Sequence, residues 1–287
     1  MNILERFHQG LETGLAWLLN PLFFRIRNLL RFRRKKVFRD APVLLEALPG
    51  YAQSQLQSDR YVYLESRYGL QAYSDRLSCS SLYGAYFFLD VLDQAYALID
   101  SEKTSSHELK VLDVGTKNFD AAPALYQFFK KSNRAGIEAL VSLTGIEIDA
   151  YRVYRSLYSR YDVGLFYRDL IEQAGPEERH RYLAGDFLKH DEKYDVLTCF
   201  FPFVSAFALL AWGLPRSKLK PNRFVTHLMA RLNPGGRALI VNQTEQERDI
   251  QVALFEAASI PVSSYEIKLN FREGQPIGYL HILERPS

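Results

Sequence analysis

The segment KVLDVGTKNFD, residues 110–120, decides the expected fold of this chain. Its apolar run leads directly to Asp113 and Gly115, a pattern typical of a buried strand followed by a tight turn. In nucleotide-binding α/β folds such a strand opens into a glycine-rich loop that lies against the ligand. Here the loop TKNFD contains no glycine. The segment therefore predicts the first strand of an α/β sheet and a loop that departs from the usual pattern.

Downstream of this strand, short apolar runs alternate with helical segments as far as the C-terminus. The expected strands are 109–114, 139–148, 180–187, 194–201 and 236–243, the expected helices are 120–131, 150–173, 223–232 and 246–258, and a hairpin closes the chain at 263–285. Strands that alternate with helices pair in parallel through right-handed crossovers. We therefore predict an α/β fold with a doubly wound, mostly parallel seven-stranded sheet, a C-terminal antiparallel hairpin and a helical N-terminal extension.

Three units are expected along the chain: a basic arm at residues 1–40, a helical subdomain at 41–105 and the Rossmann-like sheet domain at 106–287. The middle unit shows no strand alternation, and its residues 80–99 are largely apolar, as in a buried helix. Tyrosines at this density are more typical of packing than of a binding site. The ones in question are Tyr61, Tyr63, Tyr68 and Tyr73.

Basic residues are concentrated in residues 25–39, RIRNLLRFRRKKVFR, which contain eight Arg or Lys and no acid. Of the 36 basic residues in the chain, these eight leave 28 elsewhere, against 33 acidic residues. The formal net charge of +3 therefore combines a mildly acidic body with a basic arm.

The arm has the pattern of a basic amphipathic helix. The apolar positions that recur at helical spacing are Leu22, Ile26, Leu29 and Leu30, and the arginines around them are Arg25, Arg27, Arg31 and Arg34. Such a helix suits an anionic membrane surface, where each basic residue contributes on the order of 1 kcal/mol. The same density of charge suits RNA. A third interpretation is a helix docked on the protein with its charges in water.

The two cysteines, Cys79 and Cys199, provide neither a disulfide framework nor a metal site. A reducing, cytoplasmic location is therefore expected, with peripheral membrane association if the arm binds lipid. No stretch of about 18 uncharged apolar residues is present, so no membrane-spanning helix is expected. No bound metal is expected either.

Four segments, in this order, resemble class I S-adenosylmethionine (SAM)-dependent methyltransferases: VLDVG at 111–115, TGIEID at 144–149, AGDF at 184–187 and MARLNPGGRALI at 229–240. The resemblance covers roughly residues 105–287. It implies a transferase that uses SAM as cofactor, bound beyond the carboxyl ends of the strands, where ligands of open α/β sheets lie.

The resemblance also implies a set of cofactor-binding residues. Asp113 and Gly115 occupy the motif at the end of the first strand. Glu147 stands where the family places an acid on the ribose hydroxyls, and Asp149 is the alternative. A carboxylate in that place can accept both hydroxyls, as in dinucleotide-binding folds. Asp186 is the counterpart of the acid that contacts the adenine amino group, and its neighbour Phe187 is expected beside the adenine ring.

Two glycines of the family motif are replaced here by Lys117 and Phe119. Glycine permits positive φ and a close approach of the backbone to the ligand. Asn118 tolerates left-handed geometry better than most residues, so the loop can still turn. Lys117 can pair with the carboxylate of SAM or fill the cavity with its side chain, and Phe119 is expected to pack. NAD is disfavoured because the G-x-G-x-x-G fingerprint is absent after Val114.

An apolar, aromatic loop, TCFFPFVSAFALLAWGLPRSK, follows the fourth strand at residues 198–218, where the family faces its methyl acceptor. The expected substrate pocket therefore includes Phe201, Pro202, Phe203 and Trp212. Such a loop suggests a small, apolar or aromatic acceptor, or a lid that excludes water. Alternatively, its phenylalanines belong to the core. The loop lacks the Asn-Pro-Pro-Tyr type of motif used on nucleobase amino groups. No acid or base catalyst is assigned, because displacement depends mainly on positioning.

Two functions from different classes remain. One is SAM-dependent methyl transfer to a small or apolar acceptor. The other is a catalytically silent methyltransferase-like module that its basic arm recruits to a membrane or to RNA. The side chain of Lys117 distinguishes them: if it blocks the cavity, the silent module is favoured, whereas a cavity open beside Glu147 and Asp186 favours the enzyme.

Overall fold

The computed structural model describes residues 3–40, 45–98, 108–132, 140–175, 177–274 and 276–286. Its strands are β1 (Glu108–Val114), β2 (Leu140–Glu147), β3 (Arg181–Ala184), β4 (Tyr194–Phe200), β5 (Leu232–Asn242), β6 (Ser263–Lys268) and β7 (Ile277–Glu284). Its α-helices are α1 (Ile3–Leu30), α2 (Gly50–Gln55), α3 (Asp59–Tyr68), α4 (Cys79–Ala97), α5 (Ala122–Lys131), α6 (Arg160–Glu172), α7 (Ala206–Ala211), α8 (Pro221–Arg231) and α9 (Glu245–Ala257).

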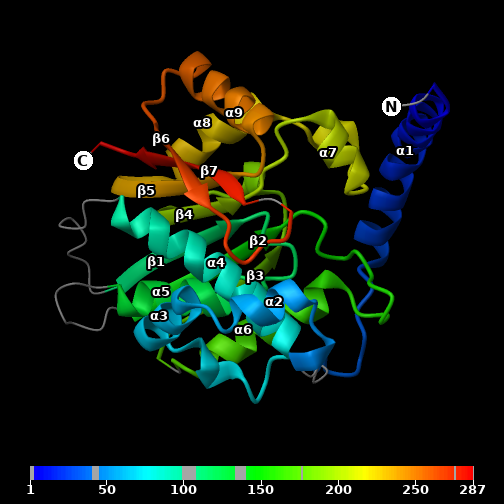
Figure 1. Ribbon diagram of the computed structural model, residues 1–287. Coiled ribbons are helices and arrows are strands. Elements are labelled where there is room, and N and C mark those ends of the chain that lie inside the picture. The colour runs from blue at the N-terminus through cyan, green and yellow to red at the C-terminus, as the bar shows by residue number, and fades with distance from the viewer. Residues whose placement is uncertain are drawn as a thin grey trace.

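The strands form one sheet in the order β3-β2-β1-β4-β5-β7-β6 (Figure 1). The first five strands pair in parallel, whereas β7 is antiparallel to both β5 and β6. The predicted doubly wound, mostly parallel sheet with an antiparallel C-terminal hairpin is confirmed. Helices α1 to α4 precede β1, so the predicted helical N-terminal extension is confirmed as well.

Side chains of β1 alternate between two cores, one on each face of the sheet. Leu109 and Val111 join the core beneath α4, α5 and α6. Leu112 and Val114 join the core beneath α8 and α9. Because both faces are covered, the strand reads as a nearly continuous apolar run, as parallel strands do.

Helices α3 and α4, which precede β1, share the first of these cores. Tyr86, Leu89 and Leu92 of α4 are fully buried in it. At the sheet edge, the Gln94 side chain donates to the carbonyl of Lys268 in β6 (2.8 Å) and accepts from its backbone N–H (3.0 Å). Residues 45–98 therefore belong to the same packed layer as α5 and α6. The boundaries predicted near residues 40 and 105 border residues outside the described ranges.

Two helices are shorter than the sequence predicts. The helix expected at 150–173 begins only at Arg160, because Ser159 and Asp162 form a capping box that satisfies the first N–H groups of α6. The amphipathic helix of the arm ends at Leu30, and Arg31 has a φ of 46°. Most of the predicted basic segment thus follows the helix instead of forming part of it.

The segment PGG, residues 234–236, lies within β5 as an irregularity. Pairing of β4 with β5 shifts register between Tyr194 and Val196. A Cβ on Gly236 would meet the carbonyl oxygen of Asn233 at 2.9 Å, so only glycine allows this close approach of backbone to backbone.

Helix α1 is docked at the carboxyl edge of the sheet through a buried ion pair. Arg27 Nε and Nη2 donate to the two carboxylate oxygens of Asp149 at 2.5 and 3.0 Å, and Nη2 also donates to the carbonyl of Gly213 at 2.8 Å. Two turns earlier, Asn20 Nδ2 donates to the carbonyl of Leu210 at the end of α7 (2.9 Å). One face of the arm is therefore fixed on the protein.

The segment after α1 is attached as well. The backbone N–H of Arg34 donates to Asp162 at 3.2 Å, and the guanidinium lies 4.5 Å from the ring centroid of Tyr158. Phe38 then packs edge-on against Tyr158 and Phe166. Across the ranges that the structure describes, no helix is long and apolar enough to cross a membrane.

We expect Arg27→Ala to lower the free energy of unfolding by about 3 kcal/mol, because it leaves the buried Asp149 carboxylate without its bidentate partner. Arg25→Ala is the matched control: Arg25 is exposed, and its removal should change stability by less than about 0.5 kcal/mol. Denaturant unfolding of both variants checks the prediction. Equal effects would contradict the role of the ion pair.

Candidate functional site

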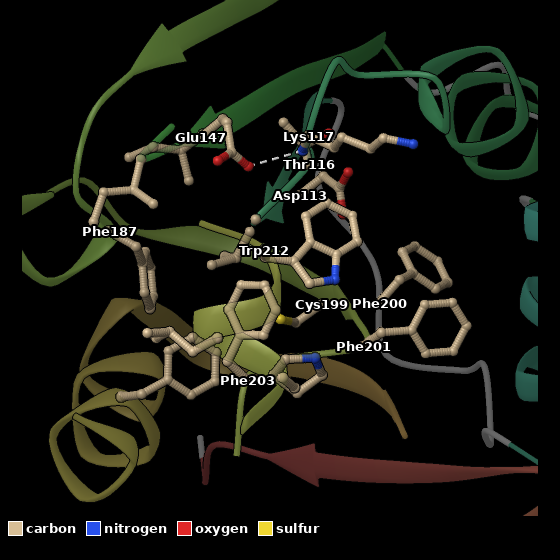
Figure 2. Close-up of a pocket in the computed structure, with 18 of the residues that line it drawn as sticks. Asp113, Thr116, Lys117, Glu147, Phe187, Cys199, Phe200, Phe201, Phe203 and Trp212 are labelled. Carbon is tan, nitrogen blue, oxygen red and sulfur yellow. Dashed lines mark hydrogen bonds between the residues drawn. The ribbon is translucent and has the colours of Figure 1, made fainter. Parts of the chain in front are cut away.

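A cavity of about 460 Å³ lies at the carboxyl ends of β1, β2 and β4, which is within the size range of small-molecule sites. The order of the strands reverses at this point, because β1 lies between β2 and β4. Ligands of open α/β sheets bind at such switch points. Figure 2 shows polar side chains along one part of the cavity and aromatic side chains along another.

All ten predicted site residues line this one cavity, although they come from four separate segments of the chain. They are Asp113, Gly115, Lys117, Glu147, Asp186, Phe187, Phe201, Pro202, Phe203 and Trp212. Their individual roles in binding remain predictions. The alternative acid, Asp149, is not among the lining residues, because Arg27 holds it in a buried ion pair away from the cavity.

Glu147 is the last residue of β2, and its carboxylate is buried. Its Oε2 accepts from the backbone N–H of Lys117 at 2.9 Å, and its Oε1 accepts from that of Asp149 at 2.8 Å. Arg160 Nη1 lies 3.4 Å from Oε1. Burial raises the pKa of Glu147, and the charge of Arg160 and the backbone donors oppose that shift.

The loop after β1 turns without the glycines of the family motif. Gly115 has a φ of 71°, and the residues in the two replaced positions also take left-handed values, 56° at Lys117 and 64° at Phe119. The expectation that Asn118 would provide the left-handed turn is wrong, since its φ is not positive. Each strained residue costs on the order of 1–3 kcal/mol, so the surrounding structure must hold this loop.

Phe119 helps to hold it by packing on β2. Its side chain is fully buried, and the ring lies over Gly145. A Cβ on Gly145 would come within 2.7 Å of two ring carbons of Phe119. The glycine whose missing side chain leaves space for this loop therefore lies in the neighbouring strand. The expectation that Phe119 packs is confirmed.

The side chain of Lys117 leaves the cavity open. Figure 2 shows it extending away from Glu147. Its side chain is 43% exposed, and Nζ lies 3.9 Å from Asp120 Oδ2. Lys117 thus contributes its backbone N–H to the centre of the site and its charge to the rim.

Asp113 is a buried carboxyl without a cationic partner in the described parts of the chain. Thr198 Oγ1 donates to it at 2.8 Å. Burial raises its pKa to about 7, and the nearby charges of Asp120 and Glu147 add to the shift, whereas the hydrogen bond from Thr198 opposes it. Such a group favours a ligand that brings a positive charge.

Asp186 and Phe187 form another wall. Asp186 Oδ1 accepts from the backbone N–H of Leu188, and Lys218 Nζ lies 2.9 Å from Oδ2. The ring of Phe187 is buried and packs edge-on against Phe224 of α8, which also lines the cavity. A planar ligand group could therefore pack against the Phe187 ring and donate a hydrogen bond to the Asp186 carboxylate.

The aromatic loop after β4 is both core and cavity wall. Phe200 packs edge-on against Phe88 of α4, at a ring distance of 4.9 Å, and Phe203 packs against Trp212 at 5.8 Å. These side chains are only partly buried, because one side of each faces the cavity. Arg160 lies 5.3 Å from the Trp212 ring centroid and so connects this wall to Glu147.

The cavity residues that the sequence analysis did not single out include Asp120, Arg160, Gln251 and Arg272. Asp120 directly follows the motif loop and could have been found from that position. Arg160 lay within the helix predicted at 150–173, where it had no distinguishing signal. Gln251 in α9 and Arg272 between β6 and β7 reach the site only through the fold.

None of the four tyrosines that the sequence analysis singled out lines the cavity; Tyr68, for example, donates to Asp93 within the core (2.6 Å). Cys199 lines the cavity, but burial raises its thiol pKa far above the usual range. Within the described part of the chain, no three His, Cys, Asp or Glu residues are grouped to hold a metal ion.

No protein-family model and no curated protein sequence matches this chain. Among solved structures, it is similar to a Listeria monocytogenes protein assigned as a class I S-adenosylmethionine-dependent methyltransferase, with 14% identity, a TM-score of 0.49 and coverage of 69% of this chain. The match spans 60% of the length of the Listeria chain.

Two further matches are similar in extent. A methyltransferase from Pyrococcus furiosus is 13% identical over 69% of this chain and 83% of its own, with a TM-score of 0.44. Magnesium protoporphyrin IX methyltransferase from Synechocystis PCC 6803, solved with bound SAH, is 12% identical. The match covers 70% of this chain and 84% of the Synechocystis chain, with a TM-score of 0.43. At TM-scores below 0.5, none of these likenesses assigns a function to this chain.

We expect Gly145→Ala to lower the free energy of unfolding by about 2 kcal/mol, because the added methyl group collides with the ring of Phe119 and over-packs the loop. Gly185→Ala is the control, since its Cβ would meet only Ile146 at an ordinary 3.7 Å. Denaturant unfolding of the two variants provides the measurement. A Gly145→Ala protein as stable as Gly185→Ala would refute the packing argument.

Proposed function

We propose that this chain transfers the methyl group of SAM to a small or apolar acceptor. The observation that carries the proposal is the pair of buried carboxyls, Asp113 and Glu147, at the ends of adjacent strands on one cavity at the switch point of the sheet. The similar solved structures are also methyltransferases, but the proposal does not rest on them.

The residues present fit SAM, which has a sulfonium and an ammonium group, two ribose hydroxyls and an adenine ring. Glu147 would accept from the ribose hydroxyls, as carboxylates do in related nucleotide sites. Asp186 would accept from the adenine amino group beside the ring of Phe187. Asp113 would lie close to a positively charged group of SAM. Thr116 Oγ1, which is buried on the same cavity, has no hydrogen-bond partner among the described residues.

When bound, SAM supplies an activated methyl group, so the protein has to position the acceptor and exclude water. The aromatic wall formed by Phe200, Phe201 and Phe203 does both. Arg272 lies 4.8 Å from the ring centroid of Phe201 and is held there by Gln243 Oε1 at 3.1 Å. No side chain is needed as a general base in this scheme.

The acceptor half also contains one polar side chain that points to a substrate group. Gln251 is 1% exposed and lines the cavity, and both its amide oxygen and its nitrogen lack hydrogen-bond partners within the described residues. A buried amide of this kind is costly unless it is satisfied. We therefore expect an apolar or aromatic acceptor that carries one polar group.

Calorimetric titration with SAM and with its demethylated product tests the cofactor site. We expect binding in the micromolar range and at least a tenfold loss in Glu147→Gln, because the amide removes the charge and one acceptor position. Glu192→Gln is the matched control: it makes the same change at a carboxylate whose side chain is 54% exposed and lies away from the cavity.

The melting temperature of the wild type and of each variant must show that the protein is folded. Absence of SAM binding by folded wild-type protein would overturn the proposal and favour the silent module. An equal loss in both glutamine variants would also count against the assigned site.

The affinity for SAM should depend on pH through Asp113. Its pKa of about 7 means that the carboxyl is largely protonated at pH 6 and ionised at pH 8. A cationic ligand favours the ionised form, so affinity should rise between these values, by up to about tenfold per pH unit below the pKa. Asp113→Asn should remove the rise, and binding of uncharged adenosine should show none. A flat profile for wild type would exclude this role.

A further inference from the structure

The face of α1 that points away from the protein carries a continuous stripe of aliphatic side chains. They recur every three or four residues and are each 41–83% exposed: Leu15, Leu18, Leu22, Ile26 and Leu29. The opposite face of the helix is the one docked through Asn20 and Arg27. Figure 1 shows α1 standing at the edge of the molecule beside α7. At 1.5 Å per residue, the stripe is about 21 Å long.

Basic side chains border this stripe on one side and follow it beyond the end of the helix, and residues 13–39 contain neither Asp nor Glu. Arg25 is three residues after Leu22 and four before Leu29, so it borders the stripe on the helix surface. Lys35 and Lys36 follow the helix and are exposed. The surface therefore combines an apolar centre with a positive margin.

We propose that this surface binds an anionic lipid bilayer. The aliphatic stripe lies at the boundary between headgroups and acyl chains, and the basic side chains pair with lipid phosphates, as amphipathic interfacial helices do. The charge is complementary to anionic lipid, and the apolar side chains gain a non-aqueous environment that the protein itself does not provide.

Other occupants fit less well. A second copy of the chain would bring its own eight basic residues against these, and like charges repel. RNA would use the basic side chains but has no contact for five aliphatic ones, because nucleic acids are bound through charge and ring stacking. Helix α1 is docked through Asn20 and Arg27, and no described helix is long and apolar enough to cross a membrane, so α1 lies on a bilayer instead of spanning it.

The bound helix would lie next to the cavity. Trp212, at the C-terminal end of α7, lines the cavity, and α7 packs against α1. Arg27 joins α1 to Asp149, two residues from Glu147. The cavity would thus lie close to the membrane surface, with α1 between them. The membrane contact itself does not rest on the proposed function.

Co-sedimentation of the full chain with vesicles tests the proposal. Two vesicle types are used, phosphatidylcholine alone and phosphatidylcholine with about one third phosphatidylglycerol, at about 0.15 M salt. We expect binding to the anionic vesicles and at least tenfold weaker binding to the neutral ones. Analytical ultracentrifugation of the same samples gives the oligomeric state.

Two double variants, each with a control, test the surface. Leu18→Glu with Leu29→Glu changes the two most exposed members of the stripe (76% and 83%) and should abolish binding. Val62→Glu, a 59% exposed position on α3, is its control and should bind normally. Lys35→Ala with Lys36→Ala should weaken binding about 25-fold, at about fivefold per basic residue. Lys193→Ala with Arg223→Ala removes the same charge from exposed positions elsewhere and should have no effect.

Three results would overturn the proposal: no sedimentation with anionic vesicles; binding that survives Leu18→Glu with Leu29→Glu; or a dimer that this double variant dissociates while vesicles are not bound. Tight binding of a labelled single-stranded RNA by wild type, together with no binding of vesicles, would assign the arm to RNA instead.

Discussion

The arrangement of the site depends on the buried carboxylate of Glu147. A charge removed from water is tolerated only if it is paired and hydrogen-bonded, so its partners have little freedom to move. They come from three segments: the N–H of Lys117 after β1, the N–H of Asp149 after β2, and the guanidinium of Arg160 at the start of α6. One side chain thereby holds two loops and a helix at the carboxyl edge of the sheet.

The loop after β1 shows how a motif can change its residues and keep its shape. Left-handed backbone at Lys117 and Phe119 costs on the order of 1–3 kcal/mol at each residue. Complete burial of a phenylalanine contributes about 1.5–3 kcal/mol, and the hydrogen bond from Lys117 to Glu147 adds to it. The strain and the packing are therefore similar in size. Gly145 in β2 supplies the room that the loop glycines supply in the family motif.

Helix α1 of the N-terminal arm contacts the residues around the site with one face and is exposed to solvent on the other. Arg27 neutralises Asp149, which leaves Glu147 as the strand-end carboxylate of β2 that lines the cavity. The aliphatic stripe on the outer face has no comparable partner within the described residues, although it is as regular as the stripe of a core helix. The same helix thus joins the cavity to a surface suited to lipid.

The sequence by itself determined the sheet, because short apolar runs that alternate with helical segments are local signals of parallel strands. The carboxyls that the fold brings to one edge were identified through the resemblance of four segments to class I methyltransferases, which implied acids at the ends of the strands. Only the tertiary structure decided which acid faces the cavity, because Arg27, 122 residues away from Asp149, selects its partner. It likewise decided that Lys117 points outward and that Gln251 and Arg272 join the site. These choices depend on long-range packing and on the pairing of buried charges, which leave no periodic trace in the chain.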